Sequence, residues 1–361
     1  MRVFIVHEDI YHAGNPYIYT LVDSIRSNHP DVEFGWGWDA FWSDEIYTYD
    51  IVHFQWPQAF MSYVPEGEAA TKLEHRLIEL KAHGVRIVAT CHDLKPHYSQ
   101  CVGYGQCLDL AYQYADMIFH LGEYSCKLFK EQYPQAKHVV IYHHVYDTIY
   151  TERPSSEESR KYLNIPSDKL CILCFGMFRS QEERDLVLNL ARRLRKEKLS
   201  FTILAPAFMK VKSLYRWKWK LIPNMQIFKY LYYRYVLNIR MTGKTWVPVE
   251  DNELPYYYGA SDMALVHRRS ILNSGNAVLP LLFDVPVVGP NVGNVGPFLK
   301  EFGYPSFDVN DDESIVNAVK EAIEMKEMQY PQKHHTDMMD KLATDVVSKR
   351  IYHEYCKILK S

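Results

Sequence analysis

A short polar turn, Ser274-Gly275-Asn276, carries the residue types that point most directly to chemistry in this sequence. An apolar run that predicts a short helix follows the turn, and a strand that begins at Pro286 comes next. The first N–H groups of a helix have no partner within the helix, and the helix dipole adds partial positive charge there. The turn therefore predicts a binding site for an anion such as a phosphate group. A plain helix cap is the alternative.

The pair His92-Asp93 is a second candidate, because it lies just after the predicted strand 85–90. Doubly wound sheets bind ligands at the carboxyl ends of their strands, so both side chains are expected at a binding edge. A neutral imidazole there could exchange a proton or bond a hydroxyl group, and the carboxylate could act as a general base. A packed or capping histidine is the alternative. His53 and His97 are weaker candidates for a ligand contact of the same kind.

Short apolar runs alternate with longer helical patterns, which is typical of α/β domains built on parallel sheets. The predicted strands are 3–6, 51–54, 85–90, 117–121, 138–142, 169–176, 199–206, 262–267 and 286–290, and the predicted helices include 69–83, 182–197, 312–328 and 337–359. The length of 361 residues favours two domains. We predict a first domain over 1–150, a Pro- and Ser-rich linker over 151–168, a second domain over 169–336 and a C-terminal helix over 337–361.

The composition is that of a globular protein, with 47% hydrophobic and 24% charged residues. The first residues turn acidic after a short apolar run, unlike a signal peptide, and no run approaches the length needed to span a bilayer. The seven scattered cysteines indicate a reduced, cytoplasmic setting. We find no metal-ligand spacing and expect neither a metal nor a bound cofactor.

The stretch 271–293 resembles the donor-site segment of GT-B glycosyltransferases of family 4, in the branch that has Ser-Gly before the helix and Pro-Val-Val after it. Further segments resemble the elements that surround the site in these enzymes: 253–268, 175–179, 52–57, 90–97 and 138–147. The resemblance covers almost the whole chain through the order and spacing of its motifs. It implies two doubly wound, Rossmann-like domains facing a central cleft, with the C-terminal helix packed back on the first domain.

The resemblance also implies an activity, the transfer of a hexose from a nucleotide diphosphate sugar to a glycan or lipid-linked saccharide in surface polysaccharide synthesis. A retaining mechanism is favoured, in which the donor's own phosphate oxygen serves as the base; an inverting one would use Asp93. The implied donor contacts are Gly176, Arg179, Arg184, Val249, Asn273, Ser274, Gly275 and Asn276. The implied acceptor contacts are Glu8, Asn15, Tyr17, His53 and His97, and the implied catalytic residues are His92 and Asp93.

Three features depart from the family pattern. Ile271 and Leu279 stand where the family commonly has glutamates for the sugar and the ribose, and Glu182-Glu183 stand where a lysine usually follows the position of Arg179. The nucleotide and the sugar are therefore open. Two alternatives also stay open: a non-catalytic nucleotide-sugar or glycan-binding protein on a degenerate scaffold, and a GT-B-like epimerase.

A basic, aromatic segment is the last feature. Residues 198–249 contain ten Lys or Arg and no Asp or Glu, with Trp and Tyr between the cations. This pattern favours an anionic membrane surface or a lipid-linked acceptor, whereas nucleic acid and a solvated helical insertion are the alternatives. We predict an insertion over about 207–245 that binds the cytoplasmic face of a membrane peripherally, and no nucleic-acid partner.

Overall fold

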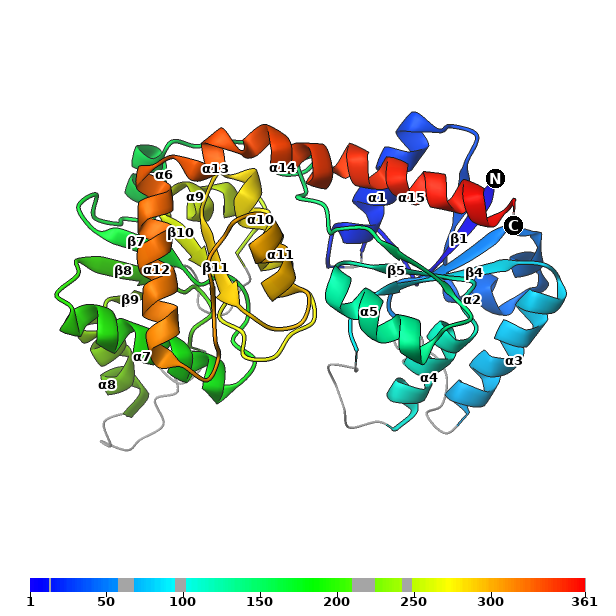
Figure 1. Ribbon diagram of the computed structural model, residues 1–361, viewed down its shortest axis with the longest axis horizontal. Helices are drawn as coiled ribbons and strands as arrows, with labels where there is room; N and C mark the ends of the chain where they lie inside the picture. The colour runs from blue at the N-terminus through cyan, green and yellow to red at the C-terminus, as the bar shows by residue number, and fades with distance from the viewer. Residues whose placement is uncertain (13, 58–67, 95–101, 210–224, 242–248, 361) are drawn as a thin grey trace, which may run out of the picture. The chain divides into compact units, whose positions relative to one another are not determined.

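The computed structural model describes residues 1–361 except 13, 58–67, 95–101, 210–224, 242–248 and 361. The chain divides into two compact units (Figure 1): unit 1 comprises Met1–Ile149 with Met339–Ser361, and unit 2 comprises Tyr150–Met338. Each unit is a six-stranded parallel sheet flanked by helices. No helix in the described ranges is both long and apolar enough to cross a membrane.

The sheet of unit 1 has the strand order β2-β1-β3-β4-β5-β6. Its strands are β1 (Arg2–Val6), β2 (Glu33–Gly35), β3 (Ile51–Phe54), β4 (Arg86–Cys91), β5 (Met117–His120) and β6 (Lys137–Val140). The chain builds outward from β1 to β2 and then returns to add β3 on the other side. The strand order therefore reverses between β1 and β3, which is where doubly wound sheets bind ligands.

The helices of unit 1 are α1 (Tyr17–Asn28), α2 (Trp38–Trp42), α3 (Ala69–Ala82), α4 (Val102–Gln113), α5 (Glu123–Gln132) and α15 (Thr344–Ile358), with a 3-10 turn η1 (Asp44–Thr48). The C-terminal α15 packs along α1, where the hydroxyls of Ser24 and Ser348 lie 2.8 Å apart. A 2.7 Å ion pair between Lys137 and Glu354 joins α15 to β6.

The predicted continuous helix over 337–359 is wrong. The structure has α14 (His335–Leu342) and α15, separated by Ala343 with an extended ψ of 144°. The Asp147 carboxylate accepts hydrogen bonds from the backbone N–H and the hydroxyl of Thr344, at 2.8 and 2.5 Å. These bonds satisfy the first turn of a new helix, so the chain breaks there although its side chains continue the helical pattern.

The sheet of unit 2 has the order β12-β11-β10-β7-β8-β9. Its strands are β7 (Leu170–Leu173), β8 (Phe201–Leu204), β9 (Ile239–Arg240), β10 (Met263–Leu265), β11 (Val287–Pro290) and β12 (Ser306–Phe307). The chain starts in the middle with β7, builds to β9, and returns to place β10 against the other side of β7. The strand order of unit 2 thus reverses between β7 and β10.

The helices of unit 2 are α6 (Ser156–Tyr162), α7 (Gln181–Lys196), α8 (Met225–Leu231), α9 (Leu254–Gly259), α10 (Gly275–Leu282), α11 (Val295–Glu301), α12 (Asp312–Glu327) and α13 (Tyr330–Lys333), with a π-helical turn η3 (Tyr232–Val236) after α8. The stretch 151–168, predicted as a linker, contains α6 and belongs to unit 2. Ser155 and Glu158 form a capping box at the start of α6, and Arg160 pairs with Asp262 at 2.7 Å.

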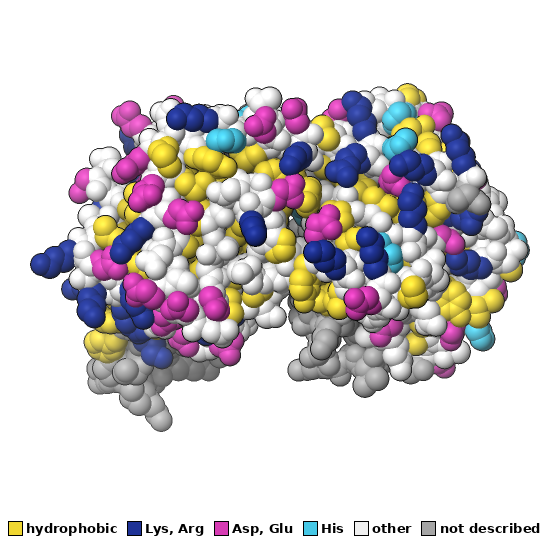
Figure 2. All heavy atoms as spheres, viewed as in Figure 1, with side chains coloured by type: hydrophobic (Ala, Val, Ile, Leu, Met, Phe, Trp, Pro, Cys, Tyr) yellow, Lys and Arg dark blue, Asp and Glu magenta, His cyan; other side chains and the backbone are white. Residues whose placement is uncertain are grey.

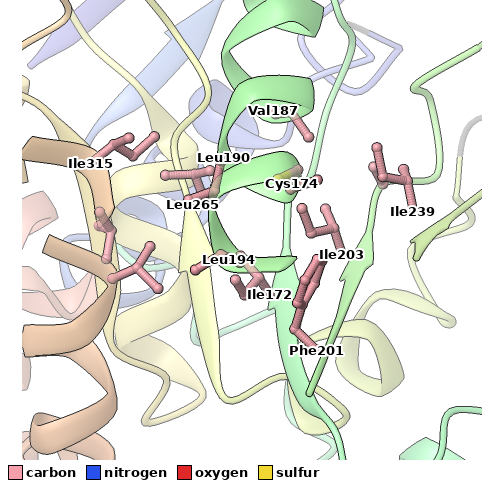
Figure 3. Close-up of a cluster of buried hydrophobic side chains, with 14 of the residues drawn as sticks. Ile172, Cys174, Val187, Leu190, Leu194, Phe201, Ile203, Ile239, Leu265 and Ile315 are labelled. Atoms are coloured by element: carbon pink, nitrogen blue, oxygen red, sulfur yellow. The ribbon is translucent and has the colours of Figure 1, made fainter. Parts of the chain in front are cut away.

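The strands of unit 2 are held in place by a hydrophobic core between the sheet and α7. Val187, Leu190 and Leu194 repeat every three or four residues on α7 and are fully buried. Figure 3 shows them directed at strand residues such as Ile172 and Ile203. Because these strands are packed against α7, the loops that follow them begin at fixed positions.

Candidate functional site

The loop after β7 lies against the start of α10. Gly176 has a φ of +92°, and the Asn276 side chain donates a 2.8 Å hydrogen bond to the carbonyl of Phe175. A Cβ on Gly176 would lie only 2.8 Å from Asn276 Nδ2, so the close approach requires glycine. The structure therefore brings together Gly176 and Asn276, two of the predicted donor contacts, at the switch point of unit 2.

The first turn of α10 is open to an anion. The helix begins at Gly275, and its N-cap residue Ser274 makes no capping hydrogen bond with its side chain. The first turn contains no acidic residue, so no carboxylate offsets the partial positive charge of the helix. Pro280 lies farther along the helix and does not delay its start. The backbone of Ser274-Gly275-Asn276 therefore forms an uncapped helix start, the kind of place where an anion can bind.

A buried ion pair holds the loop after β7 in place. Arg268, which follows β10 and is 5% exposed, pairs with Glu183 of α7 at 2.6 Å. Arg268 also donates to the carbonyl of Met177 at 2.7 Å, and the Glu183 carboxylate accepts from the backbone N–H of Arg179 at 2.6 Å. This clamp joins the ends of β7 and β10 and fixes the backbone on which Arg179 stands.

Arg179 and Arg184, both predicted as donor contacts, differ in the hydrogen bonds that their side chains make. The Arg184 guanidinium donates to the carbonyls of Phe178, Ser180 and Phe208, at 3.1, 2.8 and 3.2 Å. These bonds use three of its five N–H groups to hold the loop, and the phosphate contact predicted for Arg184 stays a prediction. The Arg179 side chain is exposed and makes no hydrogen bond or ion pair within the described part of the chain. Its guanidinium can therefore fork onto an anion.

Two further predicted donor contacts, Asn273 and Val249, are half-buried. The Asn273 side chain accepts a 2.7 Å hydrogen bond from Asn294, which is 3% exposed. That bond ties the turn before α10 to the start of α11, and Gly293 nearby approaches the Ile271 carbonyl too closely for a Cβ. Val249 is half-buried and lies outside any helix or strand.

In unit 1 an aromatic cluster occupies the carboxyl edge of the sheet. His92 follows β4, stacks on Trp56 with ring centroids 4.3 Å apart, and meets the edge of Tyr17 at 5.1 Å. Its Nε2 is 2.9 Å from the side-chain oxygen of Gln55. His143 joins the cluster at 4.7 Å from the Tyr17 ring. Trp56, His92 and His143 are half-buried and Tyr17 is buried, so the cluster presents part of its aromatic surface with polar edges, a combination that suits sugar rings.

Burial in this cluster lowers the pKa of both His92 and His143. Burial lowers the pKa of His92 to about 3 and that of His143 to about 4. Both rings therefore carry no charge at neutral pH. The two ring nitrogens of His143 lie 2.7 Å from the His144 carbonyl and 3.1 Å from the Tyr146 hydroxyl, so His143 holds the cluster together. Asp93 lies next to His92 and is half-buried.

The predicted acceptor contact at His53 is corrected. His53 is 1% exposed, its Nδ1 is 2.6 Å from the Tyr355 hydroxyl, and its Nε2 is 2.8 Å from the Thr90 hydroxyl. Both ring nitrogens are therefore occupied: Nδ1 joins the sheet to α15, and Nε2 joins β3 to β4. Tyr17 is also only 2% exposed.

The remaining predicted acceptor contacts lie in the loop after β1. The Asn15 side chain accepts from the backbone N–H of Tyr17 at 3.0 Å and from the Tyr146 hydroxyl at 3.2 Å. Glu8 accepts from the backbone N–H of Trp38 at 3.3 Å. Asn15 is exposed and Glu8 is also exposed, so both retain surface for a ligand. His97 lies outside the described residues.

The sequence predictions missed Gln55, Trp56, His143 and Arg268. All four directly follow predicted strands, so the strand-end rule that singled out His92 would have found them.

The buried histidine His53 predicts a pH dependence of stability. Burial lowers its pKa in the folded state to about 3, below the ordinary value of 6.5. As the pH falls below 6.5 the unfolded chain binds a proton that the folded chain does not, so stability falls by about 1.4 kcal/mol per pH unit from this residue. Urea unfolding of His53→Gln between pH 6 and pH 4 should show a slope shallower by that amount. Identical slopes for the variant and the parent chain would contradict it.

Known proteins match this chain in structure but not in sequence. No protein-family model matches it, and no curated protein sequence does. The sucrose-phosphate synthase from Thermosynechococcus elongatus is 11% identical and has a TM-score of 0.70, over 100% of this chain and 99% of that one. HepE from Anabaena, in complex with UDP-glucose, is 14% identical with a TM-score of 0.67, over 99% and 100%.

The chain has the GT-B fold. The GT-B match confirms the prediction of two doubly wound, Rossmann-like α/β domains. A UDP-GlcNAc 2-epimerase from Methanocaldococcus jannaschii is also similar, with a TM-score of 0.56 and 11% identity over 99% and 100% of the two chains. Because the identities are this low, the likeness is one of fold.

Proposed function

We propose that this protein is a glycosyltransferase that transfers a hexose from a nucleotide diphosphate sugar to a glycan or a lipid-linked saccharide. The observation that carries the proposal is the uncapped N-terminus of α10 against the Gly176 loop, at the switch point of unit 2. A diphosphate fits this place because it is an anion with several acceptor oxygens. HepE, whose fold this chain shares, was solved with UDP and UDP-glucose.

In this proposal the diphosphate accepts hydrogen bonds from the backbone of Ser274-Gly275-Asn276 and from the Arg179 guanidinium. Charge that develops on the leaving phosphate would be stabilised by these fixed donors. Glu183 would not repel the donor strongly, because Arg268 pairs with it at 2.6 Å. Gly176 keeps the loop close enough for backbone contact.

The acceptor side of the proposal uses the aromatic cluster of unit 1. One face of Trp56 stacks on His92, the rest of this half-buried side chain would contact an acceptor sugar, and the neutral His92 would bond a hydroxyl group of the acceptor. We favour retention of configuration, with a donor phosphate oxygen as the base. In an inverting reaction Asp93 would take that role.

Arg179→Ala is expected to weaken nucleotide-sugar binding about tenfold or more, because one charge-assisted contact to phosphate is lost. The matched control is Arg192→Ala, which removes another exposed arginine, one on α7 that bonds Asn189 at 2.9 Å. Isothermal titration with the preferred nucleotide sugar measures both. Equal affinities for the two variants would remove Arg179 from the site.

A thermal-shift screen of the intact chain against common nucleotide diphosphate sugars tests the proposal first, because a ligand that binds the folded state raises the melting temperature. We expect one nucleotide to give a clear shift that the free sugar does not give. No shift with any nucleotide sugar would contradict the proposal.

The epimerase alternative has one supporting observation, the fold likeness to a UDP-GlcNAc 2-epimerase. An epimerase would interconvert two nucleotide sugars without an acceptor, whereas a transferase would release a nucleoside diphosphate when an acceptor is added. Ile271 and Leu279, where carboxylates are common, favour a third possibility, a protein that binds the donor without turnover.

The proposal places the reaction in the cytoplasm, at the membrane surface, in the synthesis of a surface polysaccharide. Six cysteines in the described ranges are free thiols, in keeping with a reducing compartment. A lipid-linked acceptor would lie at such a surface.

A further inference from the structure

The helix α8 with the turn η3 has an unusual distribution of apolar side chains. Tyr230 and Tyr233 pack against the hydrophobic core of unit 2. A surface helix normally turns polar residues to the opposite side. Here the side chains that face away from the core are also apolar: Ile227, Phe228, Leu231, Tyr232 and Tyr235. We call these five residues the outer face of α8–η3.

The outer face is continuous and open. Its residues follow one another at spacings of one and three, so they share one side of the helical segment. Phe228 is 53% exposed and Tyr235 is 73% exposed. Monomeric proteins seldom leave a helical stripe of this kind uncovered without a use for it.

Cations flank the outer face. Lys229 is exposed and Arg234 is half-buried, and by their spacing they lie at the two borders between the outer face and the core side. Arg195 of α7 donates to the carbonyl of Val236, at the end of η3. The nearby acid Glu197 is paired with Lys320 at 2.7 Å. Figure 2 shows Lys and Arg side chains beside hydrophobic ones at the lower left, where Figure 1 draws α7 and α8, with Asp and Glu side chains next to them.

We propose that the outer face of α8–η3, with Lys229 and Arg234, docks unit 2 on an anionic lipid surface. An apolar stripe between cations, with tyrosine at its edges, matches a bilayer interface: the apolar chains enter the acyl boundary and the cations meet lipid phosphates. Single-stranded nucleic acid fits less well, because Ile227 and Leu231 offer no ring on which a base can stack. The proposal does not depend on the activity of the protein.

Flotation of the intact chain with vesicles tests this proposal. We expect recovery with vesicles of phosphatidylcholine and phosphatidylglycerol, and little with phosphatidylcholine alone. Phe228→Ser with Tyr235→Ser should abolish recovery without lowering the melting temperature, since both side chains are exposed. Lys229→Gln with Arg234→Gln should weaken the partition coefficient about tenfold or more, at roughly fivefold per cation.

The matched control is Tyr124→Ser with Leu128→Ser on α5. These two residues are an exposed apolar pair one helical turn apart, 46% and 39% exposed, beside Lys127 and Lys130 but also beside Glu123 and Glu131. We expect this variant to float like the parent chain. Equal recovery with both kinds of vesicle, no recovery at all, an equal loss in the control, or capture by single-stranded oligonucleotides in place of vesicles would each overturn the proposal.

Discussion

Ser274→Asp is expected to lower the affinity for the nucleotide diphosphate sugar by about 100-fold or more, while the fold stays as stable as before. Aspartate is a good N-cap residue, and a negative charge at a helix N-terminus is favourable, so α10 should gain stability if anything. The same carboxylate would lie within a few ångströms of the bound diphosphate. Two like charges about 4 Å apart at an effective dielectric constant of about 20 repel each other by about 4 kcal/mol.

The control for this experiment is Ser274→Asn. Asparagine caps helices as well as aspartate and has the same shape, but it carries no charge. Titration calorimetry should show an affinity within a few-fold of the parent chain for Ser274→Asn and a large loss for Ser274→Asp. If both variants bind the donor equally, the diphosphate does not sit at α10. Urea unfolding of both variants excludes a folding defect.

Arg268→Met is expected to destabilise unit 2 by about 3–5 kcal/mol. The Arg268 and Glu183 side chains are only 6% and 7% exposed, so removal of the cation leaves a buried carboxylate without its partner. The carbonyl of Met177 loses a donor as well. Urea unfolding of the intact chain, followed by circular dichroism, measures the loss.

The double variant Glu183→Leu with Arg268→Met distinguishes this cause from a simple packing defect. It removes both charges, so it should recover at least half of the lost stability, although the backbone N–H of Arg179 then lacks its acceptor. A double variant less stable than Arg268→Met would contradict the account. So would a loss below about 1 kcal/mol in the single variant.

The strands that the sequence predicted lie in longer, mostly apolar runs, such as β3 (Ile51–Phe54) and β8 (Phe201–Leu204). The strands it missed, β2, β9 and β12, have two or three residues each and sit toward the outer part of their sheets. A strand that short has no recognisable period, because its position is set by the neighbouring strand. The break at Ala343 was missed for a related reason: its cause is Asp147, which is distant in sequence.

In the candidate site, too, some features could be predicted from the sequence and others could not. The helix start at Gly275 and the loop at Gly176 could be predicted, because local residue types determine both. The roles of His53 and Arg268 could not, since each depends on partners brought in by the fold. His53 bonds Tyr355, 302 residues away, and Arg268 pairs with Glu183, 85 residues away. Sequence periodicity carries no information on such pairs.

The most direct test of the central claim is a turnover assay with the nucleotide sugar that gives the largest thermal shift and a panel of glycan and lipid-linked acceptors. We expect nucleoside diphosphate and glycosylated acceptor to form in equal amounts, with activity kept in Ser274→Asn and lost in Ser274→Asp. Donor binding without release of nucleoside diphosphate with any acceptor, or conversion of the nucleotide sugar to its epimer, would contradict the claim.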